Sequence, residues 1–368
     1  MEVRSCEADV IAGLERFACE EIGMLGARDI RAMRPGVIRF SARAIRPLLD
    51  LKTVLAVYLL RHYAIPRPKA LLGDQHLRAL LAQIDAALGL MPRDTYRTFM
   101  LGAAGAGSTV MTRLKSAIAQ HTGLREVNEE GDLLIRVRPA FDFTPDSPLP
   151  TSKASRESGV GIRQASGWDV LVRLSPKPLA TRDWRVCNIA GSLQATVAHA
   201  MALLTRPTPD DVYLNLGCGS GTLLIERALA GPARRLIGCD TDRQAIACAQ
   251  ENIAAYLKGS KDGRGAFEVH DWDMRHLPLP DASVDAITAD LPFGHRVGSH
   301  DDNVALYPAL LREAARVAKP GARCAFITAE VRLMEHTLAH MPSLWQRDST
   351  FRVNLGGLRP AIFGLRRV

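Results

Sequence analysis

The sequence predicts an α/β protein in which a doubly wound, mostly parallel sheet with an antiparallel edge strand follows two smaller α+β units. At residues 211–240 a short apolar run breaks on a glycine-rich turn, continues as a helical pattern and is followed by a second apolar run, which is the order strand, turn, helix, strand. Apolar runs and amphipathic stretches then alternate up to residue 328, as in parallel sheets that bind ligands at the carboxyl ends of their strands. Before residue 179, hairpins and helices alternate instead.

The composition is typical of a globular protein with two or three domains. The chain has 368 residues, of which 47% are hydrophobic and 23% are charged, close to the average for folded proteins. No apolar stretch reaches membrane-spanning length, and the first residues have neither the basic start nor the apolar core of a signal peptide. We therefore expect a cytoplasmic protein with no membrane partner.

The cysteines indicate neither a disulfide framework nor a metal site, because their number is odd and no CxxC pair occurs. They stand at Cys6, Cys19, Cys187, Cys218, Cys239, Cys248 and Cys324. We expect them to be thiols in the core or in loops, and we expect no bound metal.

Positive charge is concentrated in the first half of the chain. Residues 1–185 contain 27 Lys and Arg against 20 Asp and Glu, a balance of +7, whereas the remainder contains 20 against 19, a balance of +1. A basic half beside a neutral one favours a division between a part that holds a polyanion and a part that carries chemistry. A solvated, arginine-rich surface explains the charge equally well.

Residues 1–65 are expected to form a first small α+β domain. A helix over residues 14–25 has its apolar side chains on one face, and a hairpin turns on Pro35 and Gly36, two residues that favour tight turns. The other expected elements are a strand over 8–13, a helix over 44–54 and a strand over 57–65.

Residues 66–178 are expected to form a second α+β domain. Its expected elements are helices over 76–88 and 108–121 and strands over 95–103, 132–138 and 168–175. The second helix ends at Gly123, a typical helix terminator, and carries Arg113 and Lys115 on its polar side, where they could contact a polyanion.

A segment over residues 141–167 is rich in Pro, Ser and Gly, and we interpret it as a long loop. Lys153, Arg156 and Arg163 give this loop a positive character that suits phosphate groups. A solvated linker with no binding role is an equally good interpretation.

Residues 179–368 hold the doubly wound sheet. A helix over residues 193–204 precedes the glycine turn, so that Ser192 and Leu193 should lie beside a ligand there, although packing against the sheet alone explains the apolar residues of this helix. The later elements are helices over 243–257 and 304–318, strands over 266–270, 284–290 and 324–328, a turn over 319–321, and two strands within 349–368 that turn at Gly356 and Gly357.

The glycine turn has the spacing of a nucleoside-cofactor site. Gly217, Gly219 and Gly221 let backbone N–H groups approach a ligand at the open end of the helix, and Asp240, after the next strand, can accept both hydroxyls of a ribose. The third glycine of a dinucleotide fingerprint is absent, because Thr222 occupies its position. A glycine-rich turn in an ordinary α/β domain is the alternative.

This GxGxG form resembles the first motif of Rossmann-type methyltransferases that use S-adenosyl-L-methionine. These enzymes usually carry an acid where Asn215 stands, so Asn215 would contact the cofactor without supplying a charge. After the third strand of this domain, expected over residues 266–270, Asp273 and the Met274 amide are placed to meet the adenine, with the Met274 side chain against the ring.

The sequence Asp290-Leu291-Pro292-Phe293 ends a later strand and suits the methylation of an amine on a flat base. An exocyclic amine shares its lone pair with the ring and is a poor nucleophile. If the Asp290 carboxylate and the Leu291 carbonyl accept its two hydrogens, the lone pair turns toward the methyl donor, and Phe293 stacks on the base. A Pro-Gly turn after a strand is the structural alternative.

Four segments, LGCGSGTLLIERAL, VHDWDMRHLPLPD, ADLPFGHRVGS and NVALYPALLREAARV, together resemble the THUMP-domain tRNA guanine-N2 methyltransferases, in the branch whose motif reads DLPFG. The resemblance is close over residues 180–335 and weaker before them. It implies a Rossmann-fold methyltransferase domain over 179–368, an N-terminal ferredoxin-like domain over 1–65, and a THUMP-like RNA-binding domain over 66–178.

The resemblance also implies roles for single residues. Asn215, the three glycines, Asp240 and Asp273 would bind the cofactor, and Asp290 to Phe293 would be catalytic. Ser192, Leu193 and Met274 are added to the cofactor site from their positions in the chain, not from the resemblance. The THUMP-like domain would hold the 3′ end of tRNA, so that the catalytic domain reaches a guanosine in the acceptor stem, typically the sixth nucleotide. Separately from the resemblance, we expect Arg113, Lys115, Lys153, Arg156, Arg163, His295 and Arg296 to contact RNA, because they are basic or ionisable side chains near the expected substrate.

Two other classes of function stay open. The first keeps the cofactor and changes the acceptor to guanine in rRNA, adenine in DNA or glutamine in a protein. The second is an RNA-binding protein with a vestigial cofactor pocket, which Asn215 makes conceivable. A small activator subunit is not indicated by any feature of the sequence.

Overall fold

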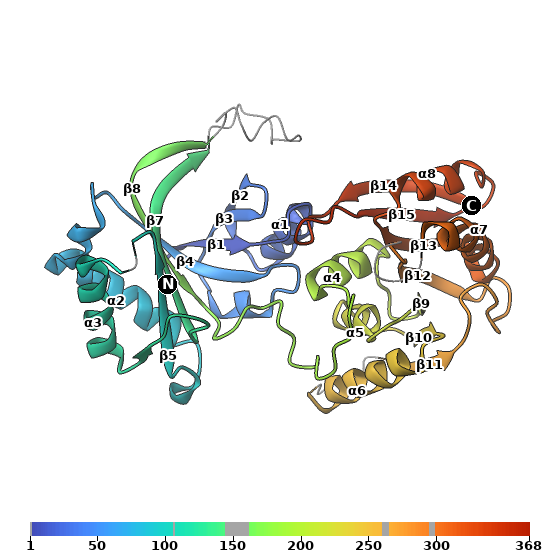
Figure 1. Cartoon of the computed structure of the whole chain (residues 1–368), viewed down its shortest axis with the longest axis horizontal. Helices are drawn as coiled ribbons and strands as arrows, with labels where there is room; N and C mark the ends of the chain where they lie inside the picture. Colours follow the sequence, from blue (N-terminus) through green and yellow to red (C-terminus); the bar gives the residue numbers. More distant parts are fainter. Residues whose placement is uncertain (1, 106, 144–161, 260–264, 294–298) are drawn as a thin grey trace. The chain divides into compact units, whose positions relative to one another are not determined.

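The computed structural model describes residues 2–105, 107–143, 162–259, 265–293 and 299–368. The chain folds into two compact units, Met1–Leu179 and Ala180–Val368, which are coloured blue to green and green to red in Figure 1. Within the described residues, no helix is long and apolar enough to cross a membrane.

The first unit is built on one eight-stranded sheet with the order β2-β3-β1-β4-β8-β7-β5-β6. Its strands are β1 (Arg4–Asp9), β2 (Arg28–Arg34), β3 (Val37–Ala42), β4 (Ala56–Tyr63), β5 (Thr98–Ala103), β6 (Arg125–Glu126), β7 (Leu133–Phe143) and β8 (Ile162–Arg173). The pairing of β4 with β8 joins strands from before and after residue 65, so the two predicted small domains share one sheet.

One face of this sheet is apolar and is covered by the three helices α1 (Glu15–Met24), α2 (Asp74–Leu88) and α3 (Thr109–Thr122). Alternate strand residues point to this face, since side chains alternate along a strand. The helix α3 begins and ends where its sequence predicts: Ser108 accepts a hydrogen bond from the Met111 amide, and Gly123 ends the helix in the left-handed conformation, which glycine adopts without strain.

The opposite face carries buried ion pairs. Glu7 on β1 is fully buried and is held by Arg39 of β3 and Arg138 of β7 at 3.0 and 2.5 Å. Arg39 also reaches Asp169 of β8 at 2.6 Å, and the guanidinium groups of Arg39 and Arg138 lie over the ring of Phe141. Part of the positive charge counted in the first half is therefore balanced inside the sheet.

Three sequence expectations for this unit need correction. The strand expected over residues 8–13 lies earlier in the chain, as β1 (Arg4–Asp9). Residues 44–54 do not form an α-helix: only a 3-10 helix, η1 (Arg46–Asp50), forms before the chain becomes extended at Leu51. The loop expected at 141–167 is shorter at both ends, because β7 continues to Phe143 and β8 begins at Ile162, with Asp142 opposite Arg163. This pairing satisfies backbone hydrogen bonds that a loop would leave to water.

The second unit is a seven-stranded sheet with the order β11-β10-β9-β12-β13-β15-β14. Its strands are β9 (Val212–Leu216), β10 (Arg235–Asp240), β11 (Ala266–Asp271), β12 (Val284–Asp290), β13 (Ala318–Thr328), β14 (Trp345–Arg352) and β15 (Ala361–Arg367). The first five in this order are parallel, and β15 runs antiparallel to both β13 and β14. The predicted doubly wound sheet with an antiparallel edge is confirmed.

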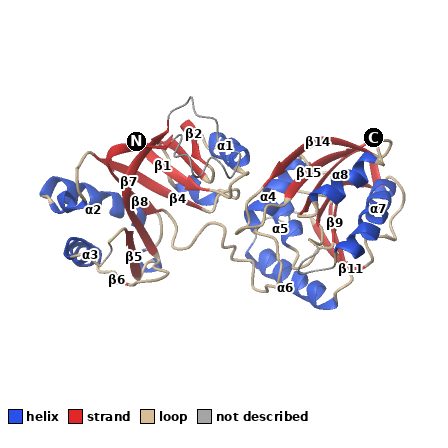
Figure 2. Cartoon of the chain, turned by 45° about the horizontal axis from the view of Figure 1, so that its top comes forward, coloured by secondary structure: helices blue, strands red, loops and turns tan. Residues whose placement is uncertain are grey.

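Helices cover both faces of this sheet (Figure 2). The helices α4 (Ala195–Leu204), α5 (Thr222–Leu229) and α6 (Arg243–Gly259) lie on one side, and α7 (His300–Val317) and α8 (Val331–Ala339) lie on the other. Strand β9 is buried along its whole length, as expected for a parallel strand between two helical layers. The glycine turn follows this central strand.

Two details of the second unit differ from expectation. The helix α8 has no counterpart in the sequence prediction, because its nine residues lie between two strands and are too few for a clear helical period. The turn expected at 319–321 is instead the irregular start of β13, where Gly321 has a φ of 82° and the register with β12 shifts.

Candidate active site

The glycine turn after β9 has an open backbone. The φ values of Gly217, Gly219 and Gly221 are 58°, 53° and 79°, which residues other than glycine rarely adopt. Gly221 is the N-cap of α5 and supplies no side-chain cap, so the first amides of this helix point toward a ligand position. A Cβ atom added at Gly217 would lie 3.0 Å from the Met274 methyl group.

The sheet register brings the predicted acids to the same edge. Asn215 of β9 pairs with Gly238 of β10 on one side and with Thr288 of β12 on the other. The strands therefore end together, and Asp240 and Asp290 both lie at the carboxyl edge of the sheet beside the glycine turn.

The acids after β10 and β11 differ in their partners. Asp240 accepts hydrogen bonds from the amides of Gly219 and Asp242 at 2.8 and 3.0 Å, which fixes its carboxylate against the glycine turn. Asp273 forms an ion pair with Arg275 at 2.6 Å. The hydrogen bond from Arg275 lowers the pKa of Asp273, so its carboxylate remains an acceptor at neutral pH.

Asn215 is fully buried in the central strand. Its Nδ2 donates to the carbonyl oxygens of Thr288 at 3.2 Å and Leu216 at 3.4 Å, which ties β9 to β12 near the end of both strands. Its Oδ1 has no hydrogen-bond partner among the described residues. A buried oxygen without a partner is costly, and a ligand amine would relieve that cost.

Residues 184–193, which precede α4, lie against the glycine turn. Ser192 Oγ lies 3.1 Å from Ser220 Oγ. Arg185 donates to Thr222 Oγ1 at 3.0 Å and to the Leu193 carbonyl at 2.9 Å. The two residues predicted beside the ligand, Ser192 and Leu193, are therefore attached to the turn and to the first residue of α5.

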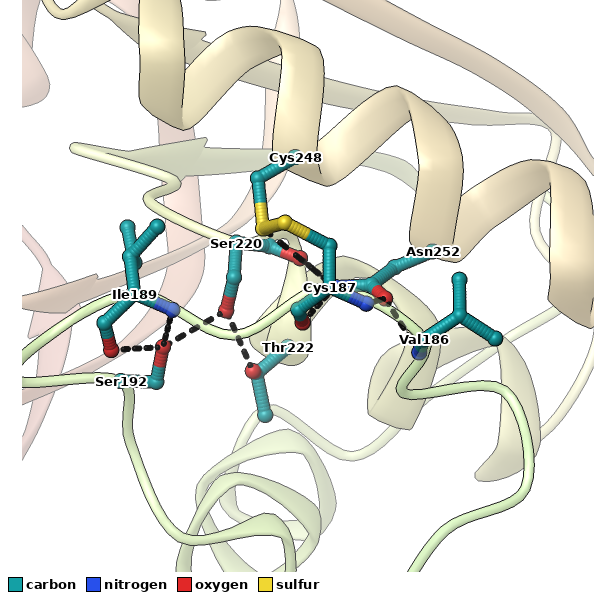
Figure 3. Close-up of a disulfide and its surroundings, with 8 residues drawn as sticks. All are labelled: Val186, Cys187, Ile189, Ser192, Ser220, Thr222, Cys248 and Asn252. Carbon is teal, nitrogen blue, oxygen red and sulfur yellow. Dashed lines mark hydrogen bonds between the residues drawn. A yellow bond between two sulfur atoms is a disulfide. The ribbon is translucent and has the colours of Figure 1, made fainter.

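Asn252 of α6 joins the same two segments (Figure 3). Its Oδ1 accepts from the amides of Val186 and Cys187, each at 2.9 Å, and its Nδ2 donates to the carbonyls of Cys187 and Ser220 at 3.0 and 2.9 Å. This fully buried side chain therefore binds residues 184–193 to the glycine turn. The sequence analysis did not identify it, since its partners lie more than 30 residues away.

A disulfide joins Cys187 to Cys248, one helical turn before Asn252. The expectation that all seven cysteines are thiols is therefore wrong for these two, and the other five are free. The two cysteines are 61 positions apart in the sequence, so no short-range spacing pattern predicts the disulfide. The fold brings α6 beside residues 184–193 and places the two side chains together.

Reduction of this disulfide should destabilise the chain. A crosslink of this span stabilises a fold by about 2–4 kcal/mol, chiefly by restricting the unfolded chain. Reductant is expected to lower the free energy of unfolding by that amount, measured by urea denaturation. It should have no further effect on the Cys187→Ser/Cys248→Ser variant, and alkylation of seven cysteines in denatured, unreduced protein would contradict the assignment.

A buried charge cluster lies behind α5. Glu226 is fully buried between Arg182, at 2.7 Å, and His199 of α4, at 2.9 Å. Burial by itself raises the pKa of Glu226, but the hydrogen bond from His199 and the charge of Arg182 outweigh burial and lower it. The cluster fixes the start of the second unit and α4 to the helix that follows the glycine turn.

The Asp290 motif begins at the last residue of β12. Asp290 is only partly exposed, and burial raises the pKa of its carboxyl to about 7. Leu291 is buried and donates its amide to the Ile327 carbonyl at 3.0 Å, whereas Pro292 and Phe293 are partly exposed. The motif therefore offers an acid and an aromatic ring next to the glycine turn.

The predicted RNA contacts are mostly untested by the structure. Arg113 is exposed on α3, but Lys115 on the same helix forms an ion pair with Glu126 at 2.7 Å. The backbone of Arg163 belongs to β8. Four of the predicted residues lie outside the described ranges: Lys153, Arg156, His295 and Arg296.

Comparison with known proteins shows which protein family the second unit resembles. Residues 182–361 match the family described as "RMKL-like, methyltransferase domain". Over 183 residues the chain is 37% identical to the tRNA (guanine(6)-N(2))-methyltransferase THUMP3 of Mus musculus, covering 48% of this chain and 36% of the mouse protein. Over 198 residues it is 30% identical to the tRNA (guanine(6)-N2)-methyltransferase of Thermus thermophilus, covering 54% and 56%.

A solved structure resembles the whole chain. The crystal structure of TrmN from Thermus thermophilus superposes with a TM-score of 0.71 and covers 100% of both chains, at 23% sequence identity. This likeness establishes the fold of both units. The sequence matches are narrower, because the chain spans about a third to a half of the length of the curated relatives.

Proposed function

We propose that this chain, whose second unit matches the RMKL-like methyltransferase family over residues 182–361, uses S-adenosyl-L-methionine to methylate the N2 amine of a guanosine in tRNA. The proposed position is the sixth nucleotide, in the acceptor stem. The observation that carries the proposal is the Asp290 motif at the strand end next to the glycine turn, together with the activity for which the similar proteins are named.

The residues at the edge of the sheet fit the cofactor. We assign the ribose hydroxyls to Asp240, the adenine to Asp273 and Met274, and the methionine end to Ser192 and Leu193. The glycine turn leaves no room for side chains at Gly217, where Met274 already lies close, and the unpaired Oδ1 of Asn215 suits an amine donor. When bound, S-adenosyl-L-methionine supplies a methyl group on a sulfonium.

The chain's own residues prepare the acceptor. The Asp290 carboxylate and the Leu291 carbonyl accept the two hydrogens of the guanine amine, so that its lone pair points out of the ring plane. Phe293 stacks on the base, a contact worth about 1–3 kcal/mol. Asp290 takes the proton that the amine releases, and a pKa near neutrality suits this role. Fixing the amine in line with its methyl donor removes about 7–11 kcal/mol of the barrier.

The first unit is the proposed tRNA-holding part, with residues 1–65 as the ferredoxin-like and 66–178 as the THUMP-like domain. Its support is the positive balance of residues 1–179, with 25 Lys and Arg against 19 Asp and Glu, and the exposed Arg113. In this proposal the unit binds the single-stranded 3′ end, and the acceptor stem extends to the catalytic edge. We propose a cytoplasmic location, where tRNA is available.

The decisive experiment is methylation of tRNA with a labelled cofactor, followed by digestion and identification of the nucleoside and its position. We expect N2-methylguanosine at position 6. The KM for tRNA should rise steeply with salt, because phosphate contacts release counterions. Label in rRNA or in DNA adenine instead would favour the alternative acceptors, and the absence of cofactor binding in a titration would favour a non-catalytic RNA-binding protein.

A further inference from the structure

The carbonyl of Pro292, in the middle of the catalytic motif, accepts two hydrogen bonds from α7. Asn303 Nδ2 donates to it at 3.1 Å and Tyr307 Oη at 2.8 Å. Both donor side chains are buried, with exposed fractions of 1% and 0%. They stand four residues apart, so they lie on the same face of the helix.

The start of α7 is itself fixed. Ser299 and Asp302 form a reciprocal capping box, in which each side chain accepts from the other residue's amide. Such a box satisfies the free amides of the first turn and holds the helix end in place. The two donors to Pro292 therefore project from a rigid helix rather than from a loop.

Tyr307 also belongs to a directed chain of hydrogen bonds. The Glu330 amide donates to Thr328 Oγ1 at 2.9 Å, and Thr328 Oγ1 lies 2.6 Å from Tyr307 Oη. An amide can only donate and a carbonyl can only accept. The Thr328 hydroxyl must therefore donate to Tyr307, and Tyr307 must donate to Pro292. Burial raises the pKa of Tyr307, which keeps the phenol protonated as a donor.

We propose that Asn303 and Tyr307 are positioning residues of the methyl-transfer site, which occupy both acceptor positions of the Pro292 carbonyl and so fix the peptide between Pro292 and Phe293. The proline ring already fixes φ at Pro292. With the peptide plane also held, the position of the Phe293 Cα atom is determined before the substrate binds. The aromatic side chain therefore extends from a fixed point of the backbone.

This arrangement also selects the acceptors for the amine. A carbonyl oxygen has two lone pairs, and both are used at Pro292, so this oxygen does not take a hydrogen of the base. Of the acceptors that the motif offers, the Asp290 carboxylate and the Leu291 carbonyl remain as the pair for the two amine hydrogens. The inference rests on the proposed function and adds two residues of α7 to its site.

Tyr307→Phe tests the inference by removing one donor without changing the shape of the core. We expect kcat for tRNA methylation to fall about tenfold or more, because small misplacements of reacting groups are costly, while the KM for the cofactor stays within about twofold. Asn303→Asp, which removes the other donor, should have the same effect. Unchanged kcat in both variants would overturn the inference.

The matched control is Tyr213→Phe. Tyr213 is also fully buried, and its hydroxyl also contacts a carbonyl and a threonine, those of Leu223 and Thr288, but it does not touch the motif. It should lose comparable stability in urea denaturation and keep kcat within about threefold. An equal loss of kcat in this control would mean that the Tyr307 effect is only structural and would also overturn the inference.

A second readout does not depend on activity. With 4-fluorophenylalanine at position 293, the wild-type chain should give one sharp fluorine resonance, and Tyr307→Phe should shift or broaden it while Tyr213→Phe leaves it unchanged. If the wild-type chain methylates no RNA, the proposed function fails and this spectrum still decides the inference. Identical spectra for all three chains would overturn it.

Discussion

Asp290→Ala is expected to lower the rate of methyl transfer to tRNA by about 100-fold or more while the affinity for S-adenosyl-L-methionine stays within about threefold. In the proposed mechanism the carboxylate both accepts an amine hydrogen and receives the released proton, and a positioned acid or base of this kind contributes about 10²–10⁴-fold. Cofactor affinity should persist because the assigned cofactor residues lie after other strands. Single-turnover rates and calorimetric titration measure the two effects, and a retained rate would refute the role of Asp290.

The pH dependence separates the two roles of Asp290. Burial raises the pKa of this carboxyl to about 7, so the accepting, ionised form increases as the pH passes through 7, and kcat/KM should rise over the same interval. Asp290→Asn keeps an accepting oxygen and removes the titration. It should retain part of the activity and lose this rise, whereas an unchanged profile in the Asn variant would assign the titration to another group.

Stability provides the control for that assignment. A folded-state pKa of about 7 lies above the value of about 3.9 in the unfolded chain. The stabilising contribution is therefore complete below the unfolded pKa and is lost as the pH rises through 7. Asp290→Asn should be more stable than the wild type at pH 8, by at most about 4 kcal/mol. Lower stability of the variant at that pH would contradict the raised pKa.

Glu226→Gln is expected to lower the free energy of unfolding by about 3–5 kcal/mol at pH 7, the cost of removing one partner from a buried ion pair. The substitution keeps the shape of the side chain and removes the carboxylate charge that lies 2.7 Å from the buried Arg182. The effect should be larger than that of any exposed pair, because water cannot solvate the remaining charge. Urea denaturation monitored by tryptophan fluorescence measures it.

Glu268→Gln is the matched control for this variant. Glu268 also pairs with an arginine, Arg235, at 2.7 Å, but both side chains are partly exposed, so the loss should be within about 1 kcal/mol. Equal losses in both variants would refute the cluster's role.

The stabilisation by Glu226 should also depend on pH, because the pKa of Glu226 is lower in the folded state. Its contribution to the free energy of unfolding is therefore present above the unfolded value of about 4.3 and is lost as the pH falls through the folded value.

The parallel part of the second sheet was predictable because each of its elements has a local signal. Strand β9 is a short, mostly apolar run that is followed by three glycines, α5 then has a helical period, and Asp240 and Asp290 end short strands that are mostly apolar. Parallel strands place their ends at one edge, so the site follows from the order of the elements. The resemblance to guanine-N2 methyltransferases is confirmed over this unit.

The short or irregular elements were less predictable. The residues of η1 suit a helix, but the chain must enter β4 five residues later, and this tertiary requirement overrides local propensity. The strand ends at Phe143 and Ile162 pair only with each other, and their Pro- and Ser-rich surroundings indicate a loop. Lys115 lies on the polar side of its helix as predicted, but the position of Glu126 opposite it depends on the fold.

The sequence by itself therefore determined the class of the sheet and the positions of the glycine turn and of the Asp290 motif at its edge, because periodicity and glycine spacing act between neighbours in the chain. Only the tertiary structure decided which distant residues hold that site: the Cys187–Cys248 disulfide, Asn252 between two segments, and Asn303 with Tyr307 on Pro292. The physical reason is that hydrogen bonds and crosslinks depend on separations of a few ångströms in space, which residues far apart in sequence reach only after the core has packed.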